Sequence, residues 1–332
     1  MKNVTKIVMV CSAGSRTGGP EASFQLVHEL NAVGLSAEIW LVTPTQVAAM
    51  EASMSRGERI GDRPELLTSE ENQFDEYARY QHTVFDGQFD SQTTFILAEK
   101  YLHLVPYLLN ARPMIWWLSV DNAFQALAKI NLNFLRLPQV RHIHQCEYAQ
   151  QVLQSLGISS QPVFDYTVID DTARSIPLPD RRMKVALTAG RKVIFPLKQF
   201  AQKLCSIEPN LEVVLLQGLS REAVYEALST ARLFYDMGNF PGNDRMYREA
   251  LLFGTPVMTL DVAGATGGAL AQLPSFYRPT LSQATSSPTI QKMLHILHHP
   301  SLHDAQYEDL RRVVGRERET FSRQVIQAFV GG

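Results

Sequence analysis

Two successive arrays of short apolar segments alternate with helical patterns, and this alternation restricts the fold more than any other feature. The first array opens with KIVMVCS (6–12), a continuous β-branched run of the kind that forms a buried parallel strand. A helical stripe over 20–33 ends at Gly34, and AEIWLV (37–42) predicts the next strand. Further strands of this array are expected at 94–98, 113–120 and 140–146. Residues 51–92 are polar and weakly periodic, and they are expected to form an insertion with one helix and a loose stretch.

The two arrays are separated by residues 159–182, which contain three prolines and no sustained period. The second array is expected to have strands at 184–189, 211–217, 232–236 and 256–261, with helices between them. Two such arrays predict an α/β fold of two Rossmann-like, doubly wound domains that face each other across a cleft. The predicted boundaries are 1–165 for the first domain, 166–183 for the linker, 184–302 for the second domain and 303–332 for a helix that braces the first.

Composition narrows the class of protein. The 332 residues suit two domains, and the net charge of −2 gives no general attraction to nucleic acid. The three cysteines lie far apart and form no metal-ligand spacing, which favours a reducing cytoplasm. The N-terminal apolar run IVMV is too short for a signal peptide or a membrane span.

A glycine-bearing loop leads from the strand at 232–236 into a strongly charged helix. Gly238 and Gly242 allow close approach of a ligand, and Asn243 or Asp244 can cap the helix. Helix N-termini at strand ends are sites for phosphate, and a carboxylate there can accept hydrogen bonds from a ribose. Two i,i+4 ion pairs on a solvated helix face, each worth about 0.3 kcal/mol, explain the same charges without any ligand. The residues alone leave these two readings nearly even.

The segment PGNDRMYREALLFGTPVMT resembles the nucleotide-sugar motif of GT-B glycosyltransferases of the family 4 type, in particular a bacterial branch with PGKDRMPREA. The segments MIWWLSVDN and HQCEYAQQVL, the pair Asp165-Tyr166 and the basic pair in TAGRKV follow the same branch in the same order. The resemblance covers most of the chain and is weakest over 44–92.

The resemblance implies roles for matched residues. Glu249 matches the second glutamate of a paired motif that holds the nucleotide ribose, while Pro241 replaces the first. Arg191 and Lys192 match the basic pair that neutralises the donor diphosphate without a metal. The donor-binding residues expected from motif and resemblance together are Arg191, Lys192, Gly242, Asp244, Arg245 and Glu249.

The first array carries the expected acceptor side. Gly18 and Gly19 form a GGxE turn that faces the cleft in the resembled family, and they do not belong to a P-loop. Asp121, at the end of a predicted strand, is the candidate for an acceptor-positioning or base residue, and a helix cap is an equally good explanation. The basic, apolar run 129–141 could touch a membrane surface, although an ordinary amphipathic helix accounts for it.

These observations favour a metal-independent, retaining glycosyltransferase. It would take a nucleotide-diphosphate sugar as donor substrate, without a cofactor, and use a glycan, lipid-linked or protein acceptor. The expected setting is the cytoplasm or the inner face of the membrane, in polysaccharide or glycoconjugate assembly. Two alternatives remain: a catalytically degenerate nucleotide-sugar-binding module, which Pro241 keeps open, and a nucleotide-sugar epimerase on the same fold.

Overall fold

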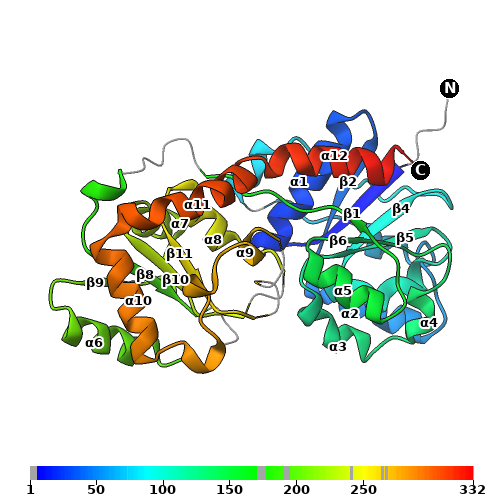
Figure 1. Cartoon of the computed structure of the whole chain (residues 1–332). Coiled ribbons are helices and arrows are strands. Elements are labelled where there is room, and N and C mark those ends of the chain that lie inside the picture. Colours follow the sequence, from blue (N-terminus) through cyan, green and yellow to red (C-terminus); the bar gives the residue numbers. More distant parts are fainter. Residues whose placement is uncertain are drawn as a thin grey trace. The chain divides into compact units, whose positions relative to one another are not determined.

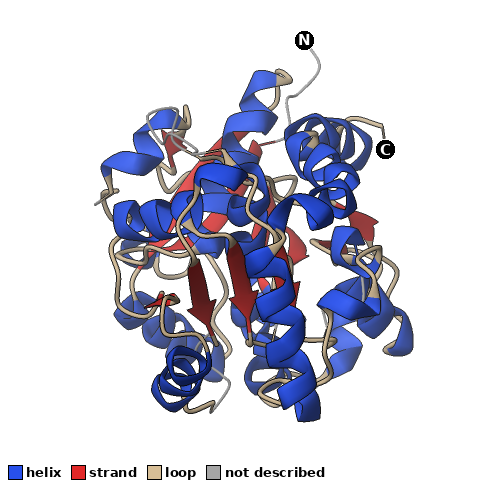
Figure 2. Ribbon diagram, turned by 60° about the vertical axis from the view of Figure 1, so that its left-hand side comes forward, coloured by secondary structure: helices blue, strands red, loops and turns tan. Residues whose placement is uncertain are grey.

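The structure, a computed structural model, describes residues 6–72, 74–169, 177–189, 195–239, 242–262, 265 and 268–331. The chain divides into two compact units. The first comprises Met1–Asp165 and Glu319–Gly332, and the second comprises Tyr166–Arg318. Each unit contains a sheet of parallel strands with helices packed around it (Figures 1 and 2).

The sheet of the first unit has seven strands in the order β3-β2-β1-β4-β5-β6-β7. Its strands are β1 (Lys6–Ser12), β2 (Ser36–Val42), β3 (Thr83–Val84), β4 (Thr94–Ala98), β5 (Arg112–Trp117), β6 (Arg141–His144) and β7 (Gln161–Pro162). β2 and β3 follow on one side of β1, and the chain then crosses to the other side of β1, where it forms β4. This reversal creates a topological switch point between β1 and β4, where open α/β sheets bind their ligands.

Helices connect these strands. They are α1 (Gly18–Ala32), α2 (Pro44–Ser55), α3 (Phe124–Leu127), α4 (Leu132–Leu135) and α5 (Glu147–Ser155), with 3₁₀ segments η1 (Pro64–Leu67), η2 (Asp75–Arg79), η3 (Glu99–Leu108) and η4 (Val120–Ala123). The expectation of a loose stretch over 51–92 missed β3, which pairs with β2 through Glu38 and Thr83. β3 has two residues, both exposed, so it carries no hydrophobic alternation by which a strand is recognised.

The sheet of the second unit has four strands in the order β11-β10-β8-β9. Its strands are β8 (Lys184–Thr188), β9 (Glu212–Leu215), β10 (Leu233–Asp236) and β11 (Val257–Thr259). Its helices are α6 (Leu197–Ile207), α7 (Arg221–Thr230), α8 (Arg245–Leu252), α9 (Gly268–Ala271), α10 (Ser287–His298) and α11 (Pro300–Gly315), with 3₁₀ segments η5 (Leu178–Asp180), η7 (Ser275–Tyr277) and η8 (Leu281–Gln283). The chain again reverses direction, so the switch point of this unit lies between β8 and β10.

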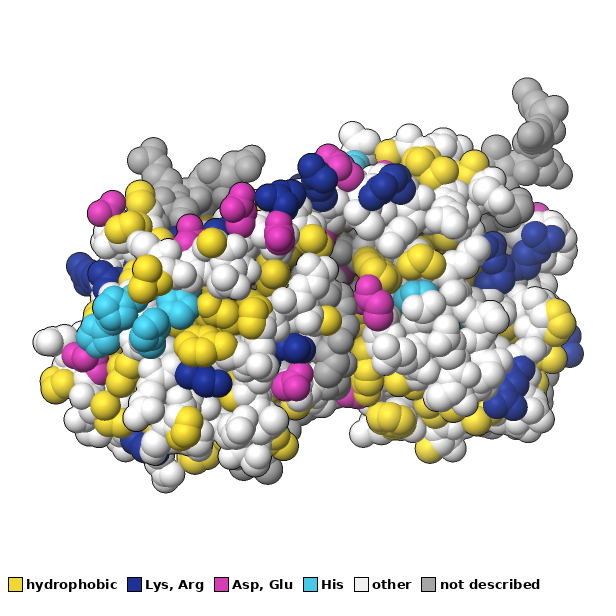
Figure 3. All heavy atoms as spheres, viewed as in Figure 1, with side chains coloured by type: hydrophobic (Ala, Val, Ile, Leu, Met, Phe, Trp, Pro, Cys, Tyr) yellow, Lys and Arg dark blue, Asp and Glu magenta, His cyan; other side chains and the backbone are white. Residues whose placement is uncertain are grey.

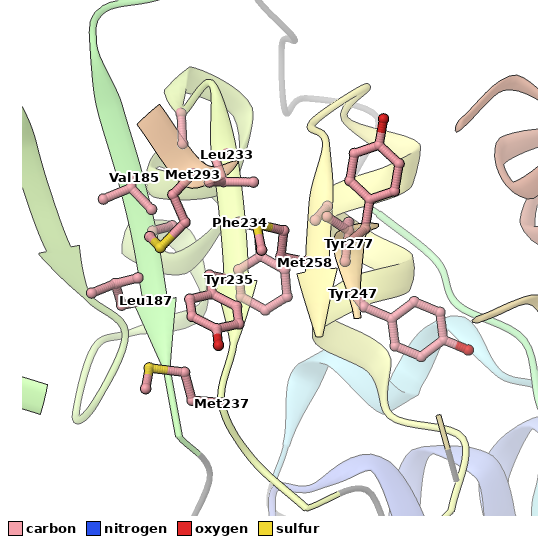
Figure 4. Packing of buried hydrophobic residues seen from close by; sticks show 14 of the residues in the cluster. Val185, Leu187, Leu233, Phe234, Tyr235, Met237, Tyr247, Met258, Tyr277 and Met293 are labelled. Atoms are coloured by element: carbon pink, nitrogen blue, oxygen red, sulfur yellow. The ribbon is translucent and has the colours of Figure 1, made fainter. Parts of the chain in front are cut away.

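The core of the second unit lies around β10, one of the two inner strands of its sheet. Phe234 and Tyr235 are fully buried there, with Leu187 of β8 and Met258 of β11 beside them (Figure 4). The Tyr235 hydroxyl donates to the Ala284 carbonyl oxygen at 2.9 Å, so its polar end is satisfied inside the core. This packing fixes β10, and therefore fixes the point at which the loop toward α8 begins.

The C-terminal region forms two helices, whereas the sequence predicted a single helix within 303–332. α11 ends at Gly315, and α12 (Glu317–Phe329) begins two residues later. Phe321 of α12 is fully buried, and its ring stacks on that of Trp116 with centroids 6.5 Å apart. Arg141 also donates to the Ala328 carbonyl oxygen at 2.6 Å. These contacts anchor α12 on the strands of the first unit.

Replacement of Phe321 by alanine tests this anchor. We expect the free energy of unfolding to fall by about 3–4 kcal/mol, because the change removes a buried ring and leaves a cavity beside Trp116. Urea denaturation followed by tryptophan fluorescence measures the effect. Ile326→Ala is the matched control, since Ile326 lies on the same helix but is 46% exposed. Equal effects of the two substitutions would contradict the anchoring role.

His144 makes the stability of the first unit depend on pH. Burial lowers the pKa of His144 to about 4, and its Nδ1 atom lies 2.8 Å from the Ser160 hydroxyl. The neutral ring therefore stabilises the fold above its unfolded pKa of about 6.5, and this contribution is lost as the pH falls through 4.

His144→Gln should therefore make the unfolding free energy less dependent on pH. Between about pH 7 and about pH 4, protonation of His144 should lower the unfolding free energy of the native protein by up to about 3 kcal/mol. The variant should not show this decrease. Urea denaturation at a series of pH values measures the slope, and His299→Gln at an exposed histidine is the control. A wild-type slope in the His144 variant would refute this assignment.

Candidate functional site

The switch point of the second unit brings two loops together. Met237 donates its amide to the Thr188 carbonyl oxygen at 2.8 Å, so the backbone after β10 continues alongside the end of β8. At Gly238 an added Cβ would lie 3.2 Å from the backbone carbon and oxygen of Ala189, and 2.9 Å from Oδ1 of Asp236. Only glycine fits this approach without displacing its neighbours. The loops that follow β8 and β10 therefore start in contact.

The glycine-bearing loop ends at the N-terminus of α8. Asp244 is the N-cap, and its side chain accepts a hydrogen bond from the Met246 amide at 2.9 Å. Gly242, two residues before Asp244, forms an isolated β-bridge and is partly buried, as is Arg245 in the first turn. The structure thus places the predicted residues Gly242, Asp244 and Arg245 at one helix start beside the carboxyl edge of the sheet.

Glu249 lies one turn further along α8 and is 7% exposed. Its Oε1 atom is 3.5 Å from the hydroxyl of Tyr225 on α7, and that hydroxyl also lies 3.2 Å from the Val168 carbonyl oxygen. Arg248 is fully buried. The face of α8 that carries Arg248 and Glu249 is therefore buried, whereas the alternative of simple surface ion pairs placed both residues on a solvated face.

Sequence reasoning missed Asp236, the last residue of β10. It is 2% exposed, and its Oδ1 atom accepts the Gly238 amide at 2.7 Å. Burial, with a smaller contribution from the Asp244 carboxylate, raises the pKa of Asp236 well above its ordinary value. Strand register aligns it with Thr188 on one side and Thr259 on the other. The available signal was an acidic residue that ends an otherwise apolar strand and precedes a glycine.

Arg191, Lys192 and Pro241 lie outside the described residues. In the sequence, Arg191 follows Ala189 by two positions, and Ala189 is the residue that Gly238 contacts. Their assignment to the donor diphosphate stays a prediction.

The switch point of the first unit carries a second group of polar residues. Gly18 and Gly19 are the first residues of α1, and no side chain caps this helix at Thr17. Ser12, which ends β1, shares a hydrogen bond of 2.8 Å with the hydroxyl of Tyr101, which follows β4. Lys100 also hydrogen-bonds the Ser12 hydroxyl, so a hydroxyl pair and an ammonium group lie at this edge.

Glu99 is the first residue after β4 and is 4% exposed. Burial raises the pKa of its carboxyl to about 7, although the amides of Leu118 and Ser119 oppose this shift. Leu118 donates its amide to Oε2 of Glu99 at 2.8 Å. The carboxyl group thus holds the turn that follows β5.

Asp121 lies in the same turn, within η4, and is partly buried. Its Oδ1 atom accepts a hydrogen bond of 2.8 Å from the Tyr148 hydroxyl. Burial first, and then Asp121, raises the pKa of Tyr148 to about 12, so the phenol remains a donor at neutral pH. Asp121 is therefore oriented by α5, which the sequence did not foresee.

The histidines have structural partners. His142 accepts a hydrogen bond from the Trp117 ring nitrogen at 3.1 Å, and its other nitrogen contacts the Leu135 carbonyl oxygen at 2.7 Å. A second group of histidines lies at the α10–α11 junction and contributes to the histidine cluster seen on one face (Figure 3): His295, His298, His299 and His303. Among the described residues, no group of three or more potential ligands has the geometry to hold a metal ion.

Within the described part of the chain, no helix combines the length and the apolar character needed to cross a bilayer.

The fold resembles solved glycosyltransferase structures over its whole length. Sucrose-phosphate synthase from Thermosynechococcus elongatus aligns with a TM-score of 0.63 at 12% identity, over 98% of each chain. Anabaena HepE in complex with UDP-glucose gives 0.60 at 9% identity, over 98% of this chain and 100% of the other. The pneumococcal O-GlcNAc transferase GtfA, in complex with UDP and GlcNAc, gives 0.60 at 11% identity, over 98% and 99%.

No protein-family model matches the sequence, and no curated protein matches it either. The structural neighbours are GT-B glycosyltransferases, whose fold consists of two Rossmann-like domains. The chain therefore has two Rossmann-like domains, as its two βα arrays predicted, in the GT-B fold that the sequence resemblance implied.

Proposed function

We propose that the chain is a glycosyltransferase that moves a sugar from a nucleotide-diphosphate sugar to a glycan, lipid-linked or protein acceptor. The observation that carries this proposal is the second unit's switch point, where the backbone of Gly238 packs on that of Ala189 immediately before the capped start of α8. A ligand at this point would lie beside Ala189, two residues before Arg191 in the sequence, and beside the helix N-terminus. Complexes of structural neighbours with UDP or UDP-glucose support a nucleotide sugar as the ligand.

Each expected donor residue has a distinct chemical task. The amides of the Gly242–Arg245 turn would face the diphosphate, and Arg191, Lys192 and Arg245 would offset its charge. The leaving nucleoside diphosphate gains negative charge in the transition state, and fixed cations with helix dipoles can stabilise that charge without a metal ion. Glu249 would accept hydrogen bonds from the ribose hydroxyls.

The first unit would hold the acceptor. Gly18 and Gly19 leave the start of α1 without bulky side chains, and Asp121 offers a carboxylate oriented by Tyr148. The resemblance to family 4 transferases supports retention of the anomeric configuration. The three cysteines are free thiols, which supports a cytoplasmic setting or one at the inner membrane face.

Nucleotide binding tests the donor site directly. We expect UDP, GDP or dTDP to raise the melting temperature of the chain, and we expect Glu249→Gln to weaken the best ligand by about 10-fold, because the neutral amide is a poorer acceptor for a ribose diol. Isothermal titration calorimetry measures the affinity. Glu226→Gln on the exposed face of α7 is the control and should bind as the native protein does. A melting temperature that no nucleoside diphosphate changes would count against the function.

Transfer itself is tested with the sugar donor identified in that screen. We expect release of nucleoside diphosphate to continue in excess EDTA, because protein cations replace a metal ion in the proposed site. Asp121→Asn should lower turnover by about 100-fold or more, the smaller effect expected when an acid–base group is lost. Proton NMR of the product gives the anomeric configuration. Loss of all activity in EDTA, with recovery on addition of Mg²⁺, would contradict the metal-independent mechanism.

A further inference from the structure

Arg248 is a charged side chain without any exposed surface, and it points back toward the start of its own helix. Its guanidinium donates to the Asn243 carbonyl oxygen at 2.8 Å and to the Asp244 carbonyl oxygen at 3.0 Å. These carbonyls belong to the turn that would face the donor diphosphate. A cation at a helix N-terminus is opposed by the helix dipole, and a buried charge costs further free energy. Packing alone does not explain an arginine here.

Glu317 supplies the opposing charge. Its Oε2 atom lies 2.9 Å from Nη1 of Arg248, and its side chain is 14% exposed. The same oxygen accepts the amide of Thr167 at 3.1 Å. One carboxylate oxygen therefore joins the first turn of α8, the start of α12 and the segment that follows β7.

These three segments have a special place in the chain. The chain leaves the first unit after Asp165 and returns to it at Glu319. Thr167 and Glu317 each lie two residues from one of these crossings. The hydrogen bond between them joins both crossing segments within the second unit, and Arg248 connects that joint to the turn at Asn243 and Asp244.

We propose that Arg248 and Glu317 are positioning residues for the nucleotide turn, and that they couple this turn to the two segments where the chain crosses between its units. The proposal deepens the donor-site function and rests on it for the identity of the ligand. Neither residue touches the ligand. They act through the two backbone carbonyls, so a change of either one shifts the amides that the diphosphate would contact.

Two conservative substitutions separate charge from shape. Glu317→Gln keeps the size and one acceptor oxygen but removes the charge that balances Arg248. Arg248→Lys keeps the charge but loses the planar fork that reaches two carbonyls and a carboxylate together. Glu308→Gln is the control, because Glu308 lies on α11 with a side chain that is 70% exposed.

The first measurement needs no ligand. Hydrogen–deuterium exchange of the full chain, analysed by mass spectrometry, follows the peptide that contains Thr167 and the peptide that covers the first turn of α8. We expect Arg248→Lys to speed exchange at Thr167 by about 10-fold, although Arg248 does not bond this amide. We expect Glu317→Gln to speed exchange in the first turn of α8 by a similar factor. The coupling is overturned if exchange at Thr167 changes only in the Glu317 variant and exchange in the first turn of α8 changes only in the Arg248 variant.

The second measurement uses UDP, or whichever nucleoside diphosphate the screen selects, with calorimetry on folded protein. We expect both variants to raise Kd by about 5–10-fold, while Glu308→Gln leaves it unchanged. A merely structural role would lower the melting temperature and leave the Kd of the folded protein at the native value, and that result would overturn the positioning role. If the native chain binds no nucleoside diphosphate, the donor function fails, but the exchange experiment still decides the coupling.

Discussion

The placement of α8 depends on buried arginines at both of its ends. Arg248 binds the carbonyls of the first turn, while Arg181 donates to the Phe253 carbonyl oxygen and, at 2.8 Å, to that of Ala231. Burial lowers the pKa of Arg181 to about 10, which still leaves it cationic at neutral pH. A cation at the C-terminal end agrees with the helix dipole, whereas the dipole opposes one at the N-terminal end, where Glu317 offsets the charge of Arg248. The two ends are therefore stabilised differently.

The glycine that ends α8 belongs to the same arrangement. Gly254 has a φ of +73°, and an added Cβ there would lie 3.7 Å from the guanidinium of Arg181. The left-handed conformation allows the chain to turn sharply into β11, so the carbonyl of Phe253 remains available to Arg181. The sequence signal GTPV thus marks a helix end that is fixed by its backbone and by a buried cation together.

The strands and their glycine stops were predictable because they depend on local patterns. Continuous β-branched runs such as residues 6–12 are buried on both faces, and this pattern indicates a strand in any parallel sheet. Residues whose role depends on distant partners were not predictable in this way. Arg248 and Glu317 are 69 positions apart, and nothing near either of them in sequence indicates the other. The break between α11 and α12 was also missed, because the helical pattern continues through Arg316.

Both switch points share a feature: a buried carboxyl group beside the end of a strand. Glu99 accepts the amide of Leu118, and Asp236 accepts that of Gly238, so each carboxyl holds the backbone of a turn at its sheet's carboxyl edge. Burial raises the pKa of both carboxyl groups and therefore favours their neutral, protonated form. A carboxyl group in its neutral form still offers the acceptor that the turn requires, and substitution by an apolar residue would remove that acceptor. The backbone of each turn therefore depends on a side chain whose charged form burial disfavours.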